Sequence, residues 1–169
     1  MITQEYLKTR LDYAPETGEF TWRNSRKGDW FNGRLAGYTG ISNYRVLSID
    51  RVLYLEHRLA WLYVYGKFPT EMLDHIDGNP SNNKLSNLRE ATRRQNCINS
   101  KIRSNNTSGF KGVSKSGKKW VARIKDKEKY LYLGLFLTPE EASEVYNQFA
   151  EDLHGNFYRD TTKENYVSQ

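Results

Sequence analysis

Three side chains in the stretch from Leu73 to Asn99 are of the types that metal-assisted hydrolysis requires. Asp74 and His75 are adjacent, a loop rich in Asp, Gly and Asn follows them, and Asn96 stands in the polar segment beyond. Asp74 and Asn96 offer oxygen ligands, which Mg²⁺ prefers, and His75 can act as a general base near neutral pH. We therefore predict a one-metal hydrolytic site, although the residue types alone leave a structural role for the Asp–His pair open.

The surrounding sequence predicts the elements that must hold these residues. Met72–Ile76 has the alternation of a strand, and the DGNP sequence after it is typical of a turn. Arg89–Ala91 is a second short strand candidate. Thr92 and Gln95 match a capping box, which places the start of a helix over Arg93–Ser100. The predicted local order is strand, loop, strand, helix, with Asn96 near the first helical turn.

Upstream of this region, apolar periodicity predicts two helices with a meander between them. The predicted elements are a helix over 1–13, strands over 19–23, 34–38, 44–49 and 51–55, a loop over 27–33, and a helix over 56–65 that Gly66 ends. His57 stands at the start of the second helix. It fits a packed or capping histidine, and a role near the active site is the alternative.

Downstream, a polar Ser- and Asn-rich stretch precedes a basic region. Strands are predicted over 112–115, 120–125 and 130–136, followed by a helix that Thr138 caps and Gly155 ends. Between Lys101 and Lys129 there are ten lysines and arginines but only two acids, whereas acids dominate the helix. A basic sheet backed by an acidic helix suits contact with phosphates. An ordinary solvated sheet is the alternative.

Composition limits the classes of protein to which the chain can belong. The formal net charge of +6 and a pI of about 9.3 favour a polyanionic partner. One cysteine excludes an internal disulfide, and with three histidines it is a poor basis for a four-ligand zinc site. The sequence has no membrane span and no signal peptide. We expect a cytoplasmic protein, and a monomer in preference to a dimer because no heptads are present.

The sequence LDHIDGNPSNNKLSNLREATRRQNCIN closely resembles the His-Asn-His (HNH) endonuclease motif of phage and intron-encoded homing enzymes, over roughly 56–100. The resemblance implies a ββα-metal active site in which His75 is the general base and Asp74 and Asn96 are the metal ligands. Asn87 would be the middle residue that braces the loop. Because Asn96 stands where many relatives have a final histidine, the resemblance favours Mg²⁺, with Mn²⁺ possible, as the cofactor.

The C-terminal region resembles the plant ethylene-response-factor (apetala-type) DNA-binding domain. The similar segments are GFKGV, WVARI, YLGLF and the PEEASEVYNQFAEDLHG helix. The resemblance implies that the sheet enters the major groove of double-stranded DNA, with Arg123 able to reach a guanine edge. The predicted DNA contacts are Arg93, Arg94, Lys111, Lys115, Lys119, Trp120, Arg123, Lys125 and Tyr132. For Trp120 the alternative is a core position on the sheet.

Together these observations predict an α+β fold with an N-terminal β-meander, a ββα-metal core, and a three-stranded antiparallel sheet packed on one helix. The predicted domains are a nuclease domain over 1–100, a linker over 101–108, a DNA-binding domain over 109–160 and a tail over 161–169. The predicted function is a site-specific, metal-dependent DNA endonuclease without an obligate protein partner, located in a bacterial cytoplasm if a phage encodes it. The alternatives are a DNA-binding regulator with an inactive nuclease core and an RNA-processing nuclease.

Overall fold

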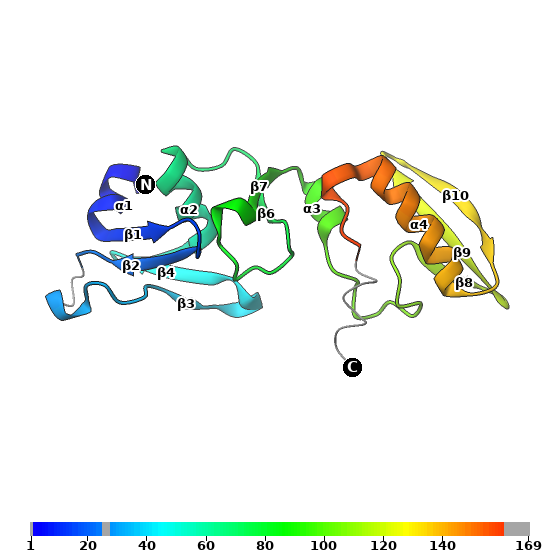
Figure 1. Cartoon of the computed structure of the whole chain (residues 1–169), viewed down its shortest axis with the longest axis horizontal. Helices are drawn as coiled ribbons and strands as arrows, with labels where there is room; N and C mark the ends of the chain where they lie inside the picture. Colours follow the sequence, from blue (N-terminus) through cyan, green and yellow to red (C-terminus); the bar gives the residue numbers. More distant parts are fainter. Residues whose placement is uncertain (1, 25–27, 161–169) are drawn as a thin grey trace. The chain divides into compact units, whose positions relative to one another are not determined.

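The computed structural model describes residues 2–24 and 28–160 and divides into two compact units, Met1–Arg93 and Arg94–Gln169 (Figure 1). Residue 27 of the predicted loop and the predicted tail over 161–169 lie outside the described residues. Within the described ranges, no helix is both long enough and apolar enough to span a membrane.

The first unit begins with α1 (Gln4–Arg10), which Thr3 caps by accepting a hydrogen bond from the backbone amide of Tyr6. The helix ends earlier than predicted because Leu11 is extended, with φ −140° and ψ 149°. Residues 11–14 instead form β1 (Leu11–Ala14), which pairs antiparallel with β2 (Glu19–Trp22). The helix prediction was therefore wrong for 11–13, where strand pairing replaces the intrahelical hydrogen bonds.

A three-stranded antiparallel sheet follows, in the order β3 (Tyr38–Thr39), β4 (Arg45–Ile49) and β5 (Val52–Leu55). Two 3₁₀ turns, η1 over Asp29–Phe31 and η2 over Ile41–Asn43, flank β3 along the chain. Of the predicted strand over 34–38, only Tyr38 lies in a strand, while Leu35 forms an isolated antiparallel bridge with Thr21. Gly37 has φ +77°, a left-handed conformation that interrupts an extended strand.

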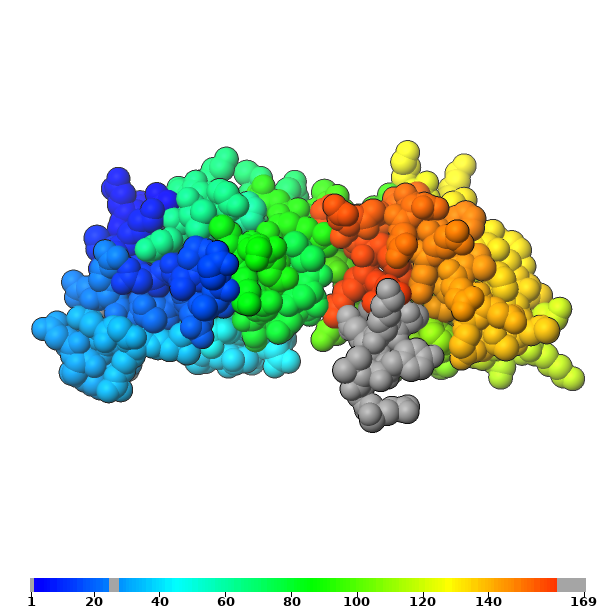
Figure 2. All heavy atoms as spheres, in the orientation of Figure 1, coloured from blue at the N-terminus to red at the C-terminus, as the bar shows by residue number. Residues whose placement is uncertain are grey.

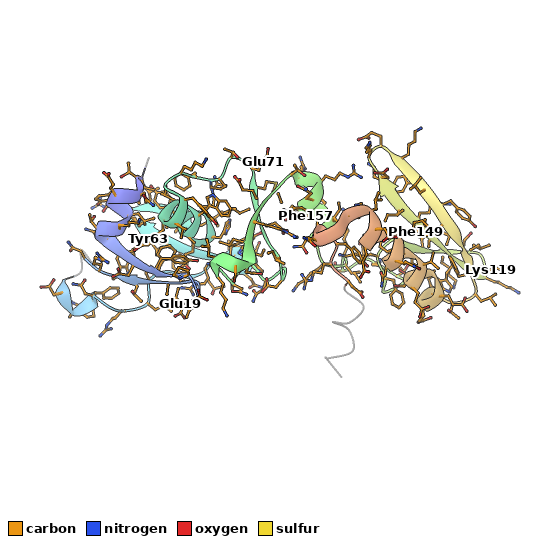
Figure 3. The ribbon with its side chains drawn as sticks, turned by 45° about the horizontal axis from the view of Figure 1, so that its top comes forward. Glu19, Tyr63, Glu71, Lys119, Phe149 and Phe157 are labelled. Carbon is orange, nitrogen blue, oxygen red and sulfur yellow. The ribbon has the colours of Figure 1, made fainter. Side chains whose placement is uncertain are left out.

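Helix α2 (Glu56–Tyr65) agrees with the prediction, and Gly66 ends it in the left-handed conformation. On α2, Tyr63 (labelled in Figure 3) packs its ring near those of Tyr13 and Phe20, with centroid distances of 5.8 and 6.2 Å. The hydrophobic core of the first unit is formed by side chains of α1, α2 and strands β1, β2, β4 and β7. Its fully buried members include Leu7, Leu11, Phe20, Leu47 and Leu59.

Strands β6 (Met72–His75) and β7 (Leu88–Ala91) form a separate antiparallel pair. The loop between them includes a 3₁₀ turn, η3 over Leu85–Asn87, and α3 (Arg93–Asn99) follows β7 along the chain. The predicted order of strand, loop, strand and helix is therefore confirmed.

The second unit contains the sheet order β10–β9–β8, formed by β8 (Val113–Ser116), β9 (Lys119–Asp126) and β10 (Lys129–Phe136). Helix α4 (Pro139–His154) begins at Thr138, whose hydroxyl accepts a hydrogen bond from the Glu141 amide, and η4 (Gly155–Phe157) follows it. The helix packs on one face of the sheet, as the orange atoms over the yellow ones show in Figure 2. The predicted α+β class, with this sheet packed on one helix, is confirmed.

Close contact between two loops of the first unit gives a test of packing. Gly18 has φ +78°, and a Cβ there would lie 2.4 Å from backbone atoms of Asn83 and Lys84. Gly33 has a similar φ of +76°, but among the described residues nothing lies within 4 Å of the Cβ position.

We expect Gly33→Ala to lower the free energy of unfolding by about 1–2 kcal/mol, the cost of a left-handed alanine. Gly18→Ala carries the same backbone cost and in addition displaces the loop at Asn83, so its loss should be larger by at least about 1 kcal/mol. Urea unfolding of the two variants measures the difference. Equal losses would show that the contact with the loop contributes nothing.

Candidate active site

The imidazole of His75, at the end of β6, lies in a buried polar cluster and is only 5% exposed. Its Nε2 is 3.1 Å from Oδ1 of Asn83, and the Asn83 amide nitrogen is in turn 3.4 Å from a carboxylate oxygen of Glu56. The rings of His57 and Tyr44 pack beside it, with centroid distances of 5.1 and 6.0 Å. His75 is therefore held by contacts from several segments of the first unit.

His57, at the start of α2, is packed against His75 and buried from solvent. Burial, together with the neighbouring His75 and Arg58, lowers the pKa of His57 to about 3. The ring is therefore neutral at neutral pH. The sequence left open whether His57 is a packed residue or has a role near the site. The structure shows it buried, with its ring packed against that of His75.

The carboxylate of Asp74 is paired with a guanidinium. Asp74 and Arg89 are directly opposite in the β6–β7 register, and the Arg89 Nε lies 2.9 Å from Asp74 Oδ2. Both side chains are largely buried, at 5% and 17% exposure. Because consecutive strand residues point to opposite faces, the Asp74 carboxylate and the His75 ring leave β6 on different sides.

Asn87 links the two ends of the loop between β6 and β7. Its side-chain amide donates to Asp77 Oδ1 at 2.9 Å and to the Asn82 carbonyl at 2.8 Å, and its oxygen accepts from the Asp77 amide. Burial opposes ionisation of Asp77, but hydrogen bonds from Asn79, Asn82 and Asn87 outweigh it and lower the pKa of this carboxyl. These are the contacts expected of a residue that braces the loop.

Asn96 lies in α3 and is half-buried, in the second compact unit, whereas Asp74 and His75 belong to the first. Within 2–24 and 28–160, no group of three or more His, Cys, Asp or Glu side chains could hold a metal ion. Asp74 and Asn96 nevertheless offer one carboxylate and one amide oxygen. These donors suit Mg²⁺, which binds few protein ligands and keeps several of its waters.

In the second unit, two basic and two aromatic side chains lie on the sheet face opposite α4. Arg123 pairs across the strands with Tyr132, and Lys125 with Tyr130. All four are exposed, and the Lys125 ammonium lies 5.8 Å from the Tyr130 ring centroid. We call Arg123, Lys125, Tyr130 and Tyr132 the open sheet face. Alternate residues of β9, such as Ala122, are buried beneath α4.

Several other predicted DNA contacts have different surroundings. Trp120 packs on the core beneath α4, and the Lys115 ammonium lies 5.9 Å from its ring centroid. Lys111 donates to the carbonyls of Ile98 and Arg159 at 3.2 and 3.1 Å. Arg94 forms an ion pair with Asp126 at 3.2 Å. Arg93 and Lys119 are exposed, in the first and second units respectively (Lys119 is labelled in Figure 3).

Sequence reasoning missed Asn83, Arg89 and Tyr130, which contact His75, Asp74 and Lys125. It also missed Glu56, which contacts Asn83. Tyr130 could have been found, because the short turn between β9 and β10 places it opposite Lys125. Arg89 lies opposite Asp74 across the long loop over 76–87, whose length does not set the register of the two strands. Asn83 and Glu56 are separated by 27 residues. No local sequence pattern connects such a pair.

Comparison with known proteins identifies the family to which the chain belongs. A family model described as HNH endonuclease matches residues 54–97, which include Asp74, His75 and Asn96. An HNH endonuclease of Acanthamoeba polyphaga mimivirus, itself uncharacterised, is 33% identical over 137 residues, covering 80% of this chain and 68% of the relative. The chain belongs to the HNH endonuclease family. Its prediction as a nuclease, a hydrolase, is thereby confirmed.

Two further similarities cover much of this HNH endonuclease. Protein 3.8 of Escherichia phage T7 is 36% identical over 106 residues, which are 61% of this chain and 87% of the phage protein. A solved structure of the HNH homing endonuclease I-HmuI gives a TM-score of 0.41 at 19% identity, covering 87% of this chain and 85% of that one.

The low pKa of His57 predicts how stability depends on pH. The folded pKa of about 3 lies below the ordinary value of 6.5, so between these values the unfolded chain binds a proton that the folded chain does not. The His57 contribution is therefore complete above about pH 6.5 and is lost as the pH falls toward 3, by at most about 1.4 kcal/mol per pH unit. Urea unfolding between pH 7 and pH 5 measures this slope. His57→Phe, which cannot titrate, should show a shallower slope, and an unchanged slope would contradict the prediction.

Proposed function

We propose that this HNH endonuclease is a divalent-metal-dependent, site-specific DNA endonuclease that hydrolyses phosphodiester bonds. The observation that carries the proposal is the adjacency of Asp74 and His75 at the end of β6, within the region that matches the family. A carboxylate that can hold a cation and an imidazole that can accept a proton are the two groups that metal-assisted hydrolysis of a phosphodiester requires.

The proposed roles follow from the chemistry of each side chain. His75 accepts the proton of the attacking water, which requires an unprotonated imidazole held in place. Asp74 and Asn96 are the proposed ligands of Mg²⁺ or Mn²⁺. When bound, the cation neutralises charge on the scissile phosphate and stabilises the leaving oxygen. Asn87 maintains the loop between the strands through its hydrogen bonds to Asp77 and Asn82.

The open sheet face is the proposed DNA-binding surface, in the manner of the ethylene-response-factor type domain that this region resembles. Its exposed Arg123 can donate to a guanine edge, while Lys125 and other lysines neutralise phosphates. Tyr130 and Tyr132, at 70% and 63% exposure, add large aromatic surfaces beside these cations. The formal charge of +6 favours the same polyanionic partner.

The ion pair between Asp74 and Arg89 favours a second candidate, a DNA-binding regulator with an inactive nuclease core, because the guanidinium already neutralises the carboxylate. Calorimetric titration with Mg²⁺ or Mn²⁺ separates the two candidates. Saturable binding that Asp74→Ala and Asn96→Ala each weaken supports the endonuclease. No binding to the unmodified protein, together with no cleavage, supports the regulator.

The decisive test of the endonuclease is metal-dependent cleavage of phage and bacterial genomic DNA, with the cut ends located by run-off sequencing. We expect His75→Ala to lower the cleavage rate by at least about 100-fold, because the proton acceptor is lost. DNA affinity, measured by fluorescence anisotropy, should stay within about twofold. Full activity of this variant would exclude His75 as the base, and absence of any cleavage by the unmodified protein would exclude the function.

Arg123 should determine where the DNA is cut rather than whether it is cut. Loss of a base contact of this kind costs about 1–3 kcal/mol of discrimination. We therefore expect Arg123→Ala to lower cleavage at the preferred site about 10–100-fold more than cleavage of random DNA. Lys129→Ala, an exposed cation on the same hairpin that pairs with Asp126 in the register, is the matched control. Equal loss on both substrates would limit Arg123 to contacts with phosphate.

A further inference from the structure

A path of buried polar side chains runs through the first unit and ends at His75. Arg45 Nε donates to Glu56 Oε2 at 2.8 Å, and Asn83 Nδ2 donates to the same oxygen at 3.4 Å. Asn83 Oδ1 then lies 3.1 Å from His75 Nε2. We call these four residues, Arg45, Glu56, Asn83 and His75, the buried polar path.

The backbone of Asn83 is fixed independently of its side chain. The Tyr13 hydroxyl, which is buried, donates to the Asn83 carbonyl at 2.7 Å. On the other side, the backbone of Gly18 approaches so closely that it leaves no room for a Cβ. Asn83 itself is 1% exposed. The side-chain amide of Asn83 is therefore attached to a fixed backbone position, within hydrogen-bonding distance of Glu56 and His75.

The chemistry of the path sets the direction of each hydrogen bond. An ionised carboxylate only accepts hydrogen bonds, so the NH₂ group of Asn83 must face Glu56. The Asn83 oxygen then faces His75 and can accept but not donate. His75 Nε2 must therefore carry the hydrogen in the neutral ring, and Nδ1 carries the lone pair.

Burial of the Glu56 carboxylate costs free energy of folding. It is fully buried, and its Oε1 has no hydrogen-bond partner among the described residues. Burial raises the pKa of Glu56, while the hydrogen bonds from Arg45 and Asn83 oppose the shift. A Cβ on Gly37 would lie 1.8 Å from Oε1, so the backbone there must be glycine. A buried ion pair is often no more stabilising than well-packed apolar side chains of similar volume, so stability alone is a weak explanation for this carboxylate.

We propose that Asn83 and Glu56 are positioning residues that hold His75 in its Nε2-protonated tautomer, with Nδ1 as the nitrogen that accepts the proton of water. The inference rests on the proposed role of His75 as the general base. Glu56 acts on Asn83 and Asn83 acts on His75, so neither touches the substrate. Arg45 supplies a counter-charge to Glu56, and its second contact to the Ala36 carbonyl at 2.8 Å fixes its own position.

The first test reads the tautomer directly in the metal-free full-length protein. Nitrogen-15 NMR of labelled histidine distinguishes the two tautomers, and single substitution of each of the three histidines assigns the signals. At a pH where His75 is neutral, we expect the Nε2-protonated form. The Nδ1-protonated form in the unmodified protein would overturn the proposal, whether or not the protein cleaves DNA.

The second test uses a pair of substitutions matched in size. Glu56→Gln keeps an oxygen that can accept from Arg45 and Asn83, whereas Glu56→Met fills the same volume without an acceptor. We expect Glu56→Gln to retain the Nε2-protonated tautomer. Glu56→Met and Asn83→Ala should raise the fraction of the Nδ1-protonated tautomer and lower kcat for cleavage by about 10–100-fold, with KM for DNA within about twofold.

The outcomes separate this inference from the proposed function. An unchanged tautomer in both Glu56→Met and Asn83→Ala would overturn the positioning role, even if the unmodified protein cleaves DNA well. A changed tautomer in these variants supports the positioning role even if no DNA is cleaved, in which case the proposed function fails alone. If Glu56→Met does not fold, the tautomer measured in Asn83→Ala and in the unmodified protein still tests the positioning role.

Discussion

The hydrogen bonds of one buried amide, that of Asn83, organise the part of the first unit around His75. Its backbone carbonyl accepts from Tyr13 on β1, and its side chain lies between Glu56 of α2 and His75 of β6. A buried amide or carboxylate left without a partner costs about 1–3 kcal/mol. A shift of any one element would leave such groups unpaired, so the elements must keep their relative positions. His75 is thus held both by the folding of the loop that carries Asn83 and by the pairing of its own strand with β7.

The two residues proposed for chemistry on β6 are held by different kinds of contact. Asp74 is neutralised by Arg89 from the neighbouring strand, a pair that strand register alone brings together. His75 is held by uncharged hydrogen bonding to Asn83, and the ring beside it, His57, is kept neutral by burial. The opposite faces of a short strand thereby keep the two side chains apart.

Most elements of the fold were predictable because their signals are local. Helix α2 and helix α4 follow from apolar periodicity and their end residues, and the hairpin of β9 and β10 follows from alternation around a short turn. The two errors have long-range causes. Residues 11–13 leave α1 because β2 is available for pairing, and the chain at Gly37 is left-handed because it passes close to the Glu56 carboxylate. Neither partner can be recognised from the residues that it affects.

The sequence by itself determined the types of residue that are available for chemistry: an acid and a histidine in adjacent positions, amides in the loop, and a basic sheet, all within segments whose order was predictable. Only the tertiary structure decided which groups surround them. It placed Glu56 and Asn83, 27 residues apart, in contact behind His75, and it put Trp120 beneath α4 while Arg123 faces outward. The physical reason is that hydrogen-bond direction and burial depend on atoms that folding brings together. The spacing of residues along the chain does not predict which atoms these are.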